Sequence, residues 1–445
     1  MFKWENVDLL ADTRWQGTFF PPDKMDERFF GTLTHSATEG LFLEYTMLGG
    51  DAPEIAGVLH GVLATGEAVT LLRHHEGLQP GSSFQYGTYT LSGKAYFWAM
   101  CAGLHFNAEP SFKRLDFTLS GLDEFIVPQG NTAYVPWAHQ PIIAAKMPDG
   151  ELQLINAGKV QPVGHLSSVL VNRNPTALAV LESHFQAVKS AFPKDIFLLK
   201  REMHYLLRLE YEEAVTLTGA LSRMTDIGAL FALLVRAPVH ARRISFTVKD
   251  QKDTSAEIFV FPAGFLEEAT VRLALERKNH HLMPITMQNA GLEKLVPVWL
   301  TEAVNHRVLV SGLQHQTGWR TWQDTHGALV LYATQLEAIL IDEKGPKGKK
   351  FEYAIGKYAS PKVLALLKHH LGAATLHEVG EGVSDVRNEI AHVGKPPKLL
   401  KKLNGNGLSE IALCLELIVV GYVLRKLGVD AAVVEAYQDG FAPEA

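Results

Sequence analysis

The sequence predicts an α+β protein of several domains: a β-rich region over residues 1–175, a mixed α/β continuation over 176–310, and an all-helical bundle over 311–445. Three observations predict this fold class. A chain of 445 residues is long enough for two or three separate cores. Short strand-like segments separated by turn-forming residues fill the first region. From about Gly318 onward a helical period dominates.

Regularly spaced short apolar segments mark the strands of the first region. In one of them, Phe117 and Leu119 alternate with the polar Asp116 and Thr118, which is the period of a strand buried on one face. Gly, Pro, Asn and Asp residues separate the segments, as they do in turns. Strands are expected within residues 68–72, 83–91, 115–119 and 152–155. Their spacing predicts a sandwich or a barrel-like sheet.

The middle region combines helical and strand patterns. Helices are expected over residues 176–192 and 212–235, and Leu221, Met224 and Ile227 begin an apolar stripe on the second. Two strands are expected at 243–248 and 257–261. A further helix is expected over 292–310, with an interruption near Pro297.

The helices of the last region have recognisable ends. Long apolar periods cover residues 322–341 and 408–427, and shorter ones cover 351–358 and 361–371. Gly372 is expected to stop the helix before it. Ser384 is expected to cap another helix, which Gly394 and the prolines 396–397 would end. Four or five helices with short connections predict a small up-and-down bundle.

Composition indicates the compartment. Cys101 and Cys414 are the two cysteines of the chain, and their separation disfavours a disulfide framework or a cysteine zinc site. The N-terminus lacks the pattern of a signal peptide. The most apolar stretch, 411–424, is interrupted by Glu416 and is shorter than the roughly 20 residues that a bilayer requires. We therefore expect a cytoplasmic protein without a membrane segment.

Several enzyme classes lack their motifs. Adjacent histidine pairs at 74–75, 280–281 and 369–370 would diverge on regular elements, and no HExxH spacing occurs, so neither a metal nor a cofactor is predicted. No serine lies in a G-x-S-x-G elbow, which disfavours a serine hydrolase. Five aromatic residues of the first region are expected in its core, with a sugar- or base-stacking platform as the alternative: Tyr86, Tyr89, Tyr96, Phe97 and Trp98.

The most informative motif is Arg387-Asn388-Glu389-Ile390-Ala391-His392. Arginine holds a phosphate through a planar set of donors, and histidine transfers protons near neutral pH. The pair therefore suits RNA cleavage through the ribose 2′-hydroxyl without a metal. On an ideal helix Arg387 and His392 lie about 140° apart, on either side of Ala391. The core-facing stripe would consist of Val383, Val386, Ile390 and Val393. The small Ala391 would let a second helix approach, so that a symmetric dimer combines two copies of the motif.

This motif, in a C-terminal helical bundle, resembles the R-N-x-x-x-H signature of HEPN domains. The chain resembles the ApeA-like branch, which comprises bacterial anti-phage abortive-infection proteins. Leu336-Glu337 on the helix at 322–341 supports the resemblance. The segment from Leu221 to Pro238 is similar to a helix ending in a proline turn in the N-terminal region of that branch. The chain has no evident HEPN-linked nucleotidyltransferase motif, which disfavours the antitoxin-coupled type.

The resemblance implies a metal-independent endoribonuclease, dimeric or higher, in which two HEPN domains meet at the motif. Arg387 would bind the scissile phosphate, and His392 would act as general base or acid, leaving 2′,3′-cyclic phosphate and 5′-hydroxyl ends. Asn388 would orient His392 or bind the phosphate, and Glu337 would orient a site residue; for both, a solvated polar side chain is the alternative. The lysines after the motif form either a phosphate track for RNA or a solvated face: Lys395, Lys398, Lys401 and Lys402.

Two hypotheses from different functional classes follow. In the first, the β-rich region senses a phage-derived trigger and the bundle cleaves cellular RNA, with tRNA as one candidate, to arrest growth. In the second, the chain is a non-catalytic HEPN-like module that binds a nucleotide or RNA or acts as a sensor. A third class, a carbohydrate-active β domain with a helical dimerisation tail, lacks a paired-carboxylate motif.

Overall fold

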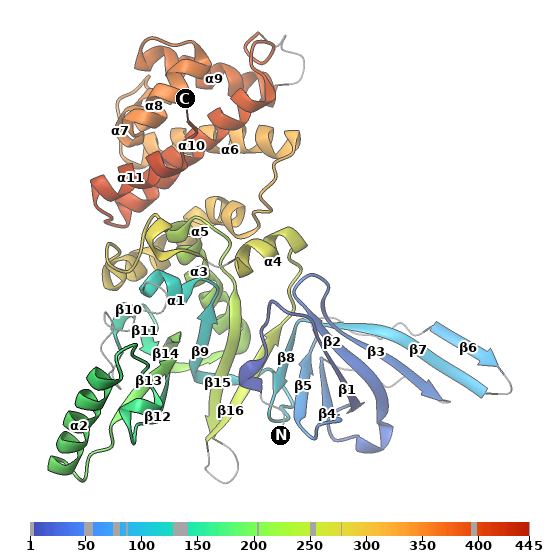
Figure 1. Ribbon diagram of the computed structural model, residues 1–445. Helices are drawn as coiled ribbons and strands as arrows, with labels where there is room; N and C mark the ends of the chain where they lie inside the picture. The colour runs from blue at the N-terminus through green and yellow to red at the C-terminus, as the bar shows by residue number, and fades with distance from the viewer. Residues whose placement is uncertain are drawn as a thin grey trace.

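The computed structural model of the chain describes residues 4–48, 57–73, 81–85, 88–127, 141–202, 204–249, 255–276, 278–392 and 398–444. A large antiparallel sheet occupies the N-terminal part, a mixed region continues it, and the C-terminal part is helical (Figure 1). The predicted fold class is thus confirmed.

One antiparallel sheet holds fourteen of the described strands, in the order β10-β11-β14-β9-β15-β16-β8-β5-β4-β1-β2-β3-β7-β6. Their bounds are β1 (Thr13–Phe20), β2 (Phe29–Ser36), β3 (Gly40–Leu48), β4 (Val58–Leu63), β5 (Ala68–Leu72), β6 (Gly81–Gln85), β7 (Thr88–Phe97), β8 (Ala99–Ala102), β9 (Ser111–Leu119), β10 (Ile143–Met147), β11 (Gly150–Asn156), β14 (Tyr205–Thr216), β15 (Ala241–Lys249) and β16 (Ser255–Pro262). A separate pair is formed by β12 (Lys159–Pro162) and β13 (Leu198–Glu202).

The sheet is continuous, whereas the sequence predicted a sandwich or a barrel. The short strand β8 accounts for this, because it pairs with β5 on one side and with β16 on the other. Strands from both sides of residue 175 therefore join one sheet. A buried residue such as Phe117 alternates with polar neighbours along β9, as the sequence predicted.

Most predicted segments coincide with observed elements. Residues 68–72 are β5, 115–119 lie in β9, and 152–155 lie in β11. Residues 83–91 include the end of β6 and the start of β7, with Tyr86 outside the described residues. Of the other predicted core aromatics, Phe97 is buried and Trp98 packs against the core, but Tyr96 lies on the outward face of β7 and is 48% exposed. The side chain of Tyr89 lies outside the described set.

The helices are α1 (Leu122–Ile126), α2 (Pro175–Ala191), α3 (Leu217–Val235), α4 (Glu268–Leu275), α5 (Leu292–Gln314), α6 (Trp322–Asp342), α7 (Glu352–Tyr358), α8 (Pro361–Leu371), α9 (Leu376–Ala391), α10 (Gly405–Lys426) and α11 (Ala431–Phe441). Two predictions for the middle region were wrong. Residues 212–216 belong to β14, because Val215 and Thr216 pair with β9 before Thr216 caps α3. Pro297 is the sixth residue of an uninterrupted α5, which loses the one hydrogen bond that an N–H at this position would make and continues to Gln314.

Helices α3 and α5 pack on each other, and α3 also packs against β9 and β14. The indole Nε1 of Trp299 on α5 donates to the carbonyl oxygen of Asp226 on α3 at 2.7 Å. By length and composition α3 and α10 could each span a membrane, yet 56% and 83% of their apolar windows are buried inside the fold. Both are therefore packed as core helices in this structure.

In the C-terminal bundle, α6 packs along α10, and α9 lies against α6, α7 and α8 (Figure 1). Nearly every residue of α10 from Ile411 to Leu424 is buried, which places the most apolar stretch at the centre of the bundle. The C-terminal helix α11, which the sequence did not reveal, packs on α8 and α10. The buried residues of the bundle belong to one hydrophobic core that continues into the sheet region, and α9 lies on the outside of the bundle.

A buried ion triad joins the sheet region to the bundle. Glu416 on α10 accepts from Arg236 at 2.8 Å and from Arg320 at 2.6 Å, and its side chain is only 3% exposed. Arg236 follows the end of α3 in the left-handed conformation, with φ of 51°. Beside it, the Tyr437 hydroxyl of α11 donates to the carbonyl oxygen of Leu233 at 2.9 Å. These contacts fix the end of α3 to the base of the bundle.

Candidate functional site

The motif occupies the last turn and a half of α9. This helix begins eight residues before the predicted cap, because Thr375 accepts from the backbone N–H of Glu378 while the Glu378 carboxylate accepts from the backbone N–H of Thr375. Ser384 is therefore an internal helix residue, and its prediction as the N-cap was wrong. The helix ends at Ala391; Gly394 and the two prolines lie outside the described residues.

The inner side of α9 is apolar, as predicted. Val383 and Val386 are each 1% exposed, and Ile390 is partly buried against the core. The fourth residue of the predicted stripe, Val393, lies outside the described part of the chain. Burial of this stripe fixes the rotation of the helix, and therefore which of its side chains face outward.

Arg387 and Asn388 form one hydrogen-bonded unit on the outer side of α9. Nη1 of Arg387 donates to Oδ1 of Asn388 at 3.1 Å, and Nδ2 of Asn388 donates to Oγ of Ser384 at 3.4 Å. Both side chains are half-buried. Nε of Arg387 is buried and has no hydrogen-bond partner among the described residues. The guanidinium is thus oriented by Asn388, while its Nε is shielded from solvent.

His392 is the C-cap residue of α9 and is exposed. Its backbone is extended (φ −116°, ψ 99°), although its N–H still donates to the carbonyl oxygen of Asn388 at 3.1 Å. The direction of its side chain therefore departs from the ideal helix on which the 140° separation from Arg387 was worked out. Because Ala391 is also exposed, the end of α9 offers a small residue between two polar ones.

Glu389, in the middle of the motif, holds the following segment against α9. Its carboxylate accepts from the backbone N–H groups of Lys398, Leu399 and Leu400 at 2.9–3.1 Å. Burial alone would raise the pKa of this carboxyl, but these backbone donors hold it below its usual value. The anchored segment carries Lys398, Lys401 and Lys402, all exposed, beside the end of the motif helix. Lys395 lies outside the described residues.

Glu337 lies on α6 and is paired elsewhere. Its carboxylate lies 3.8 Å from the Nζ of Lys350, in the segment that precedes α7. Among the described residues no hydrogen bond or ion pair connects Glu337 to the motif. Its auxiliary role in the site therefore stays a prediction.

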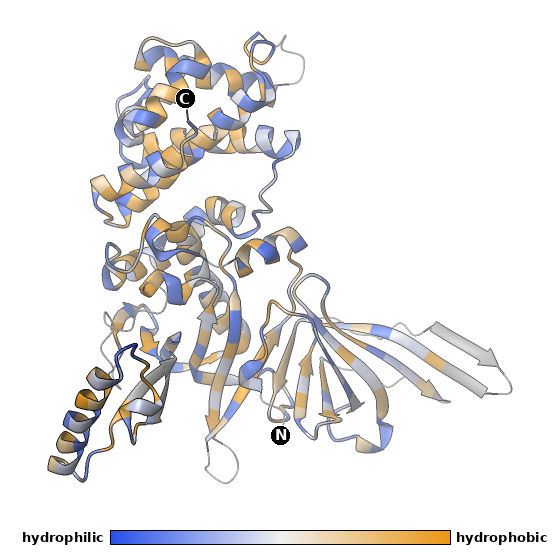
Figure 2. Ribbon diagram, viewed as in Figure 1, coloured by the Kyte–Doolittle hydropathy of each residue, from blue (hydrophilic) through white to orange (hydrophobic). Residues whose placement is uncertain are grey.

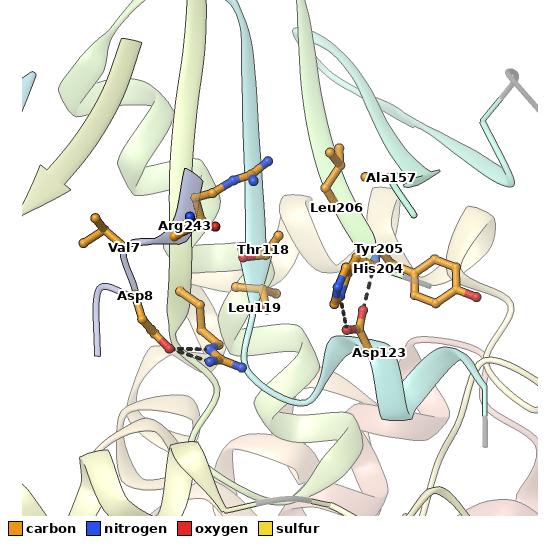
Figure 3. A pocket seen from close by; sticks show the side chains of 12 residues that line it. Val7, Asp8, Thr118, Leu119, Asp123, Ala157, His204, Tyr205, Leu206 and Arg243 are labelled. Carbon is orange, nitrogen blue, oxygen red and sulfur yellow. Dashed lines mark hydrogen bonds and ion pairs between the residues drawn. The ribbon is translucent and has the colours of Figure 1, made fainter. Parts of the chain in front are cut away.

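A second candidate site is a cavity of about 320 Å³ in the sheet region (Figure 3). Strand β9 contributes Thr118 and Leu119, with polar side chains on both sides. Asp8 accepts from Nε of Arg242 at 2.9 Å, while Asp123 accepts from the backbone N–H of Tyr205 at 2.9 Å. The cavity is lined by Asn6, Val7, Asp8, Thr118, Leu119, Asp123, Ala157, His204, Tyr205, Leu206, Arg242 and Arg243. Its paired charges suit a small polar ligand better than a strongly charged one.

Sequence reasoning missed two residues that organise these sites. Glu389 has as partners backbone N–H groups nine to eleven residues away, so no side-chain pattern could reveal it. Glu416 did carry a signal, because it is a single charge within an apolar helix. Such a residue needs a buried partner, and the partners are two arginines distant in sequence. No group of three or more metal-ligating side chains occurs within the described residues.

Comparison with known families gives one match. The family model described as ApeA N-terminal domain 1 matches residues 14–299, well over half of the chain. The matched range runs from β1 into α5 and covers the large sheet and nine of the twelve residues that line the cavity of Figure 3; Asn6, Val7 and Asp8 precede it. No curated protein and no solved structure shows significant similarity to the chain.

Proposed function

Because this chain belongs to the ApeA family of anti-phage proteins, we propose that its C-terminal bundle is a HEPN ribonuclease that cleaves cellular RNA in abortive infection. Family membership rests on residues 14–299, whereas the proposed catalytic residues lie beyond them. The observation that carries the proposal is the outer side of α9. There the half-buried Arg387 is oriented by Asn388, with His392 exposed at the end of the same helix.

The chemistry follows from these side chains. In the cleavage step the ribose 2′-oxygen attacks phosphorus, a bond from the 2′-oxygen to phosphorus forms, and the bond to the 5′-oxygen breaks. A neutral His392 accepts the 2′-hydroxyl proton, or a protonated one donates to the departing 5′-oxygen. Arg387 stabilises the charge that develops on the phosphoryl oxygens. The products are a 2′,3′-cyclic phosphate and a 5′-hydroxyl.

One histidine per chain supplies only one of these two proton transfers at a time. A symmetric dimer that places two copies of α9 face to face would supply both an acid and a base. The exposed Ala391 supports such an approach, because a small residue lets another helix come close. RNA would reach this site along the segment that Glu389 anchors, where Lys398, Lys401 and Lys402 offer phosphate contacts.

The sheet region would then sense the trigger. It contains the cavity of Figure 3. The Glu416 triad connects the sheet region to the bundle, so a conformational change in the sheet region would act directly on α10. This arrangement suits a bundle that is controlled by the sheet region.

The experiment that separates the two hypotheses uses purified full-length protein, total RNA and EDTA. Cleavage that leaves 2′,3′-cyclic phosphate ends would support a metal-independent nuclease. Tight binding with intact RNA, in the presence of the cognate phage lysate as a source of trigger, would instead support the non-catalytic module.

A further inference from the structure

Helix α2 turns its apolar side outward. Every residue of one stripe along the helix is exposed: Ala177, Val180, Leu181, His184, Ala187, Val188 and Ala191. On an ideal helix these residues span about 120° of the circumference. The helix stands at the edge of the molecule, beside the β12–β13 pair, and hydrophobic residues recur along its ribbon (Figures 1 and 2). A soluble helix normally buries such a stripe.

The opposite side of α2 holds the helix to the protein through polar side chains and through Phe185, whose ring lies 5.4 Å from the ring of Phe197. Glu182 accepts from the backbone N–H of Ser167 at 3.0 Å. Gln186 and Lys189 both donate to the carbonyl oxygen of Gly164, at 2.9 and 3.2 Å. Because these bonds come from the polar side, α2 cannot rotate its apolar stripe inward without breaking them.

The exposed apolar surface extends beyond the helix. Eight of the eighteen exposed large hydrophobic residues in the described part of the chain lie between residues 170 and 198. They are Leu170, Val171, Val180, Leu181, Val188, Phe192, Ile196 and Leu198, with exposures from 39% to 100%. Val180, Leu181 and Val188 lie on the stripe itself, while the other five precede or follow the helix along the chain. Together the eight residues expose on the order of 800 Å², about the area that a stable interface takes from each partner.

We propose that this surface, the α2 face, binds the α2 face of a second copy of the chain. Residues 177, 181, 184, 188 and 191 follow the alternating spacing of four and three residues that forms the seam of a two-helix coiled coil. Alanines at both ends of the seam let the helices approach closely. The stripe carries no acidic residue, lysine or arginine, so two identical faces meet without repulsion.

A lipid surface fits this face less well. Helices that lie on membranes carry lysine and arginine on the polar side, facing the headgroups. On α2 the polar side faces the protein, and its lysine, Lys189, is bonded to Gly164. The occupant is therefore another protein surface of the same apolar character, which an identical copy provides.

His184 lies at the midpoint of the seam, halfway between Ala177 and Ala191. Parallel and antiparallel two-fold pairings both place a central residue against its own copy. A contact between two copies of residue 184 therefore tests the proposal whichever way the helices run. This contact is separate from the proposed meeting of two α9 helices and rests on different residues.

The first test is oxidative crosslinking of full-length His184→Cys protein. The native Cys101 and Cys414 are both buried, so the introduced thiol is the accessible one. We expect a disulfide-linked dimer from His184→Cys and none from the matched Ser183→Cys protein, whose exposed position lies about 100° away on the helix. Equal crosslinking of both proteins, or crosslinking of neither, would overturn the proposal.

The second test is a charge swap measured by analytical ultracentrifugation. His184→Glu and His184→Lys proteins should each have half the mass of the wild-type assembly, because two like charges meet at the seam. A 1:1 mixture of the two should recover the wild-type mass. Unchanged masses for both variants would contradict the interface. A Leu181→Asp protein that keeps the wild-type mass but no longer protects cells from phage would also contradict it, because the α2 face would then bind a different protein.

Discussion

Replacing Glu416 by Gln should destabilise the chain more than any surface substitution of the same size. Glu416 is the single acid of the buried triad, and the amide keeps its shape but removes its charge. Arg236, 8% exposed, would then retain its charge without a counter-ion. Burial lowers the pKa of Arg236, and the charge of Glu416 is the largest of the effects that outweigh it in the wild type. The substitution removes that charge, but a guanidinium still keeps its proton, so the arginine cannot escape by losing it.

The magnitude follows from the exposure of the two arginines. Removing one partner of a buried pair costs about 3–5 kcal/mol. The side chain of Arg320 is 35% exposed, so water can replace its lost partner, and its contribution is roughly 0–1 kcal/mol. The Gln oxygen still accepts one hydrogen bond, worth about 1 kcal/mol. We therefore expect a net loss of about 3 kcal/mol, concentrated at Arg236.

Urea unfolding of the full-length protein, followed by its helical circular dichroism, measures this loss. The matched control is Arg320→Gln, which leaves the Arg236–Glu416 pair intact and should cost no more than about 1 kcal/mol. If Glu416→Gln and Arg320→Gln lowered the free energy of unfolding equally, the ranking by burial would be refuted. A loss below 1 kcal/mol for Glu416→Gln would refute the structural role of the triad.

Three further predictions concern two residues of the motif and one buried histidine of the sheet region. Glu389→Gln should weaken the anchoring of the lysine segment, seen as faster amide exchange at Leu399 and Leu400, while α9 keeps its protection. Asn388→Ala should lower the rate of RNA cleavage by roughly 10–100-fold, because it removes the acceptor that orients Arg387, and it should leave the thermal midpoint unchanged. Cleavage at the wild-type rate would exclude that role. Burial holds the pKa of His35 below 6.5, against the opposing effects of the hydrogen bond to Pro262 and the charge of Asp12. The neutral His35 therefore makes its full contribution to stability above pH 6.5. That contribution is lost as the pH falls through the folded-state pKa. Urea midpoints between pH 7 and 5 should fall less steeply in His35→Gln than in the wild type, and parallel slopes would contradict this assignment.

The sequence predicted the elements whose signal is local. Pro361–Leu371 was placed to the residue, because its apolar period lies between Ser360 and Gly372, which cap the helix. The strand at 68–72 was equally clear. The first half of α9 was missed, since Gly380 and Gly382 lower its helical propensity. Gly380 lets α9 pack closely on α7, because a Cβ at this position would lie 3.2 Å from the backbone nitrogen of Glu352 on α7.

What the sequence could not predict depends on contacts between distant segments. The sheet is continuous because β8 pairs with β16, a strand more than 150 residues away in the sequence. At the candidate site, the residue types and the apolar stripe were predictable from spacing. The Arg387–Asn388–Ser384 chain of hydrogen bonds and the anchoring by Glu389 were not, because they depend on side-chain directions and on backbone groups of another segment.

The most direct measurement of the central claim is the cleavage rate of a defined RNA by His392→Ala protein in EDTA. His377→Ala is the matched control, since His377 is exposed on the first turn of the same helix, far from the motif. We predict that His377→Ala cleaves like the wild type and leaves 2′,3′-cyclic phosphate ends, whereas His392→Ala leaves the RNA intact. Equal rates for the two variants would contradict a catalytic role for His392.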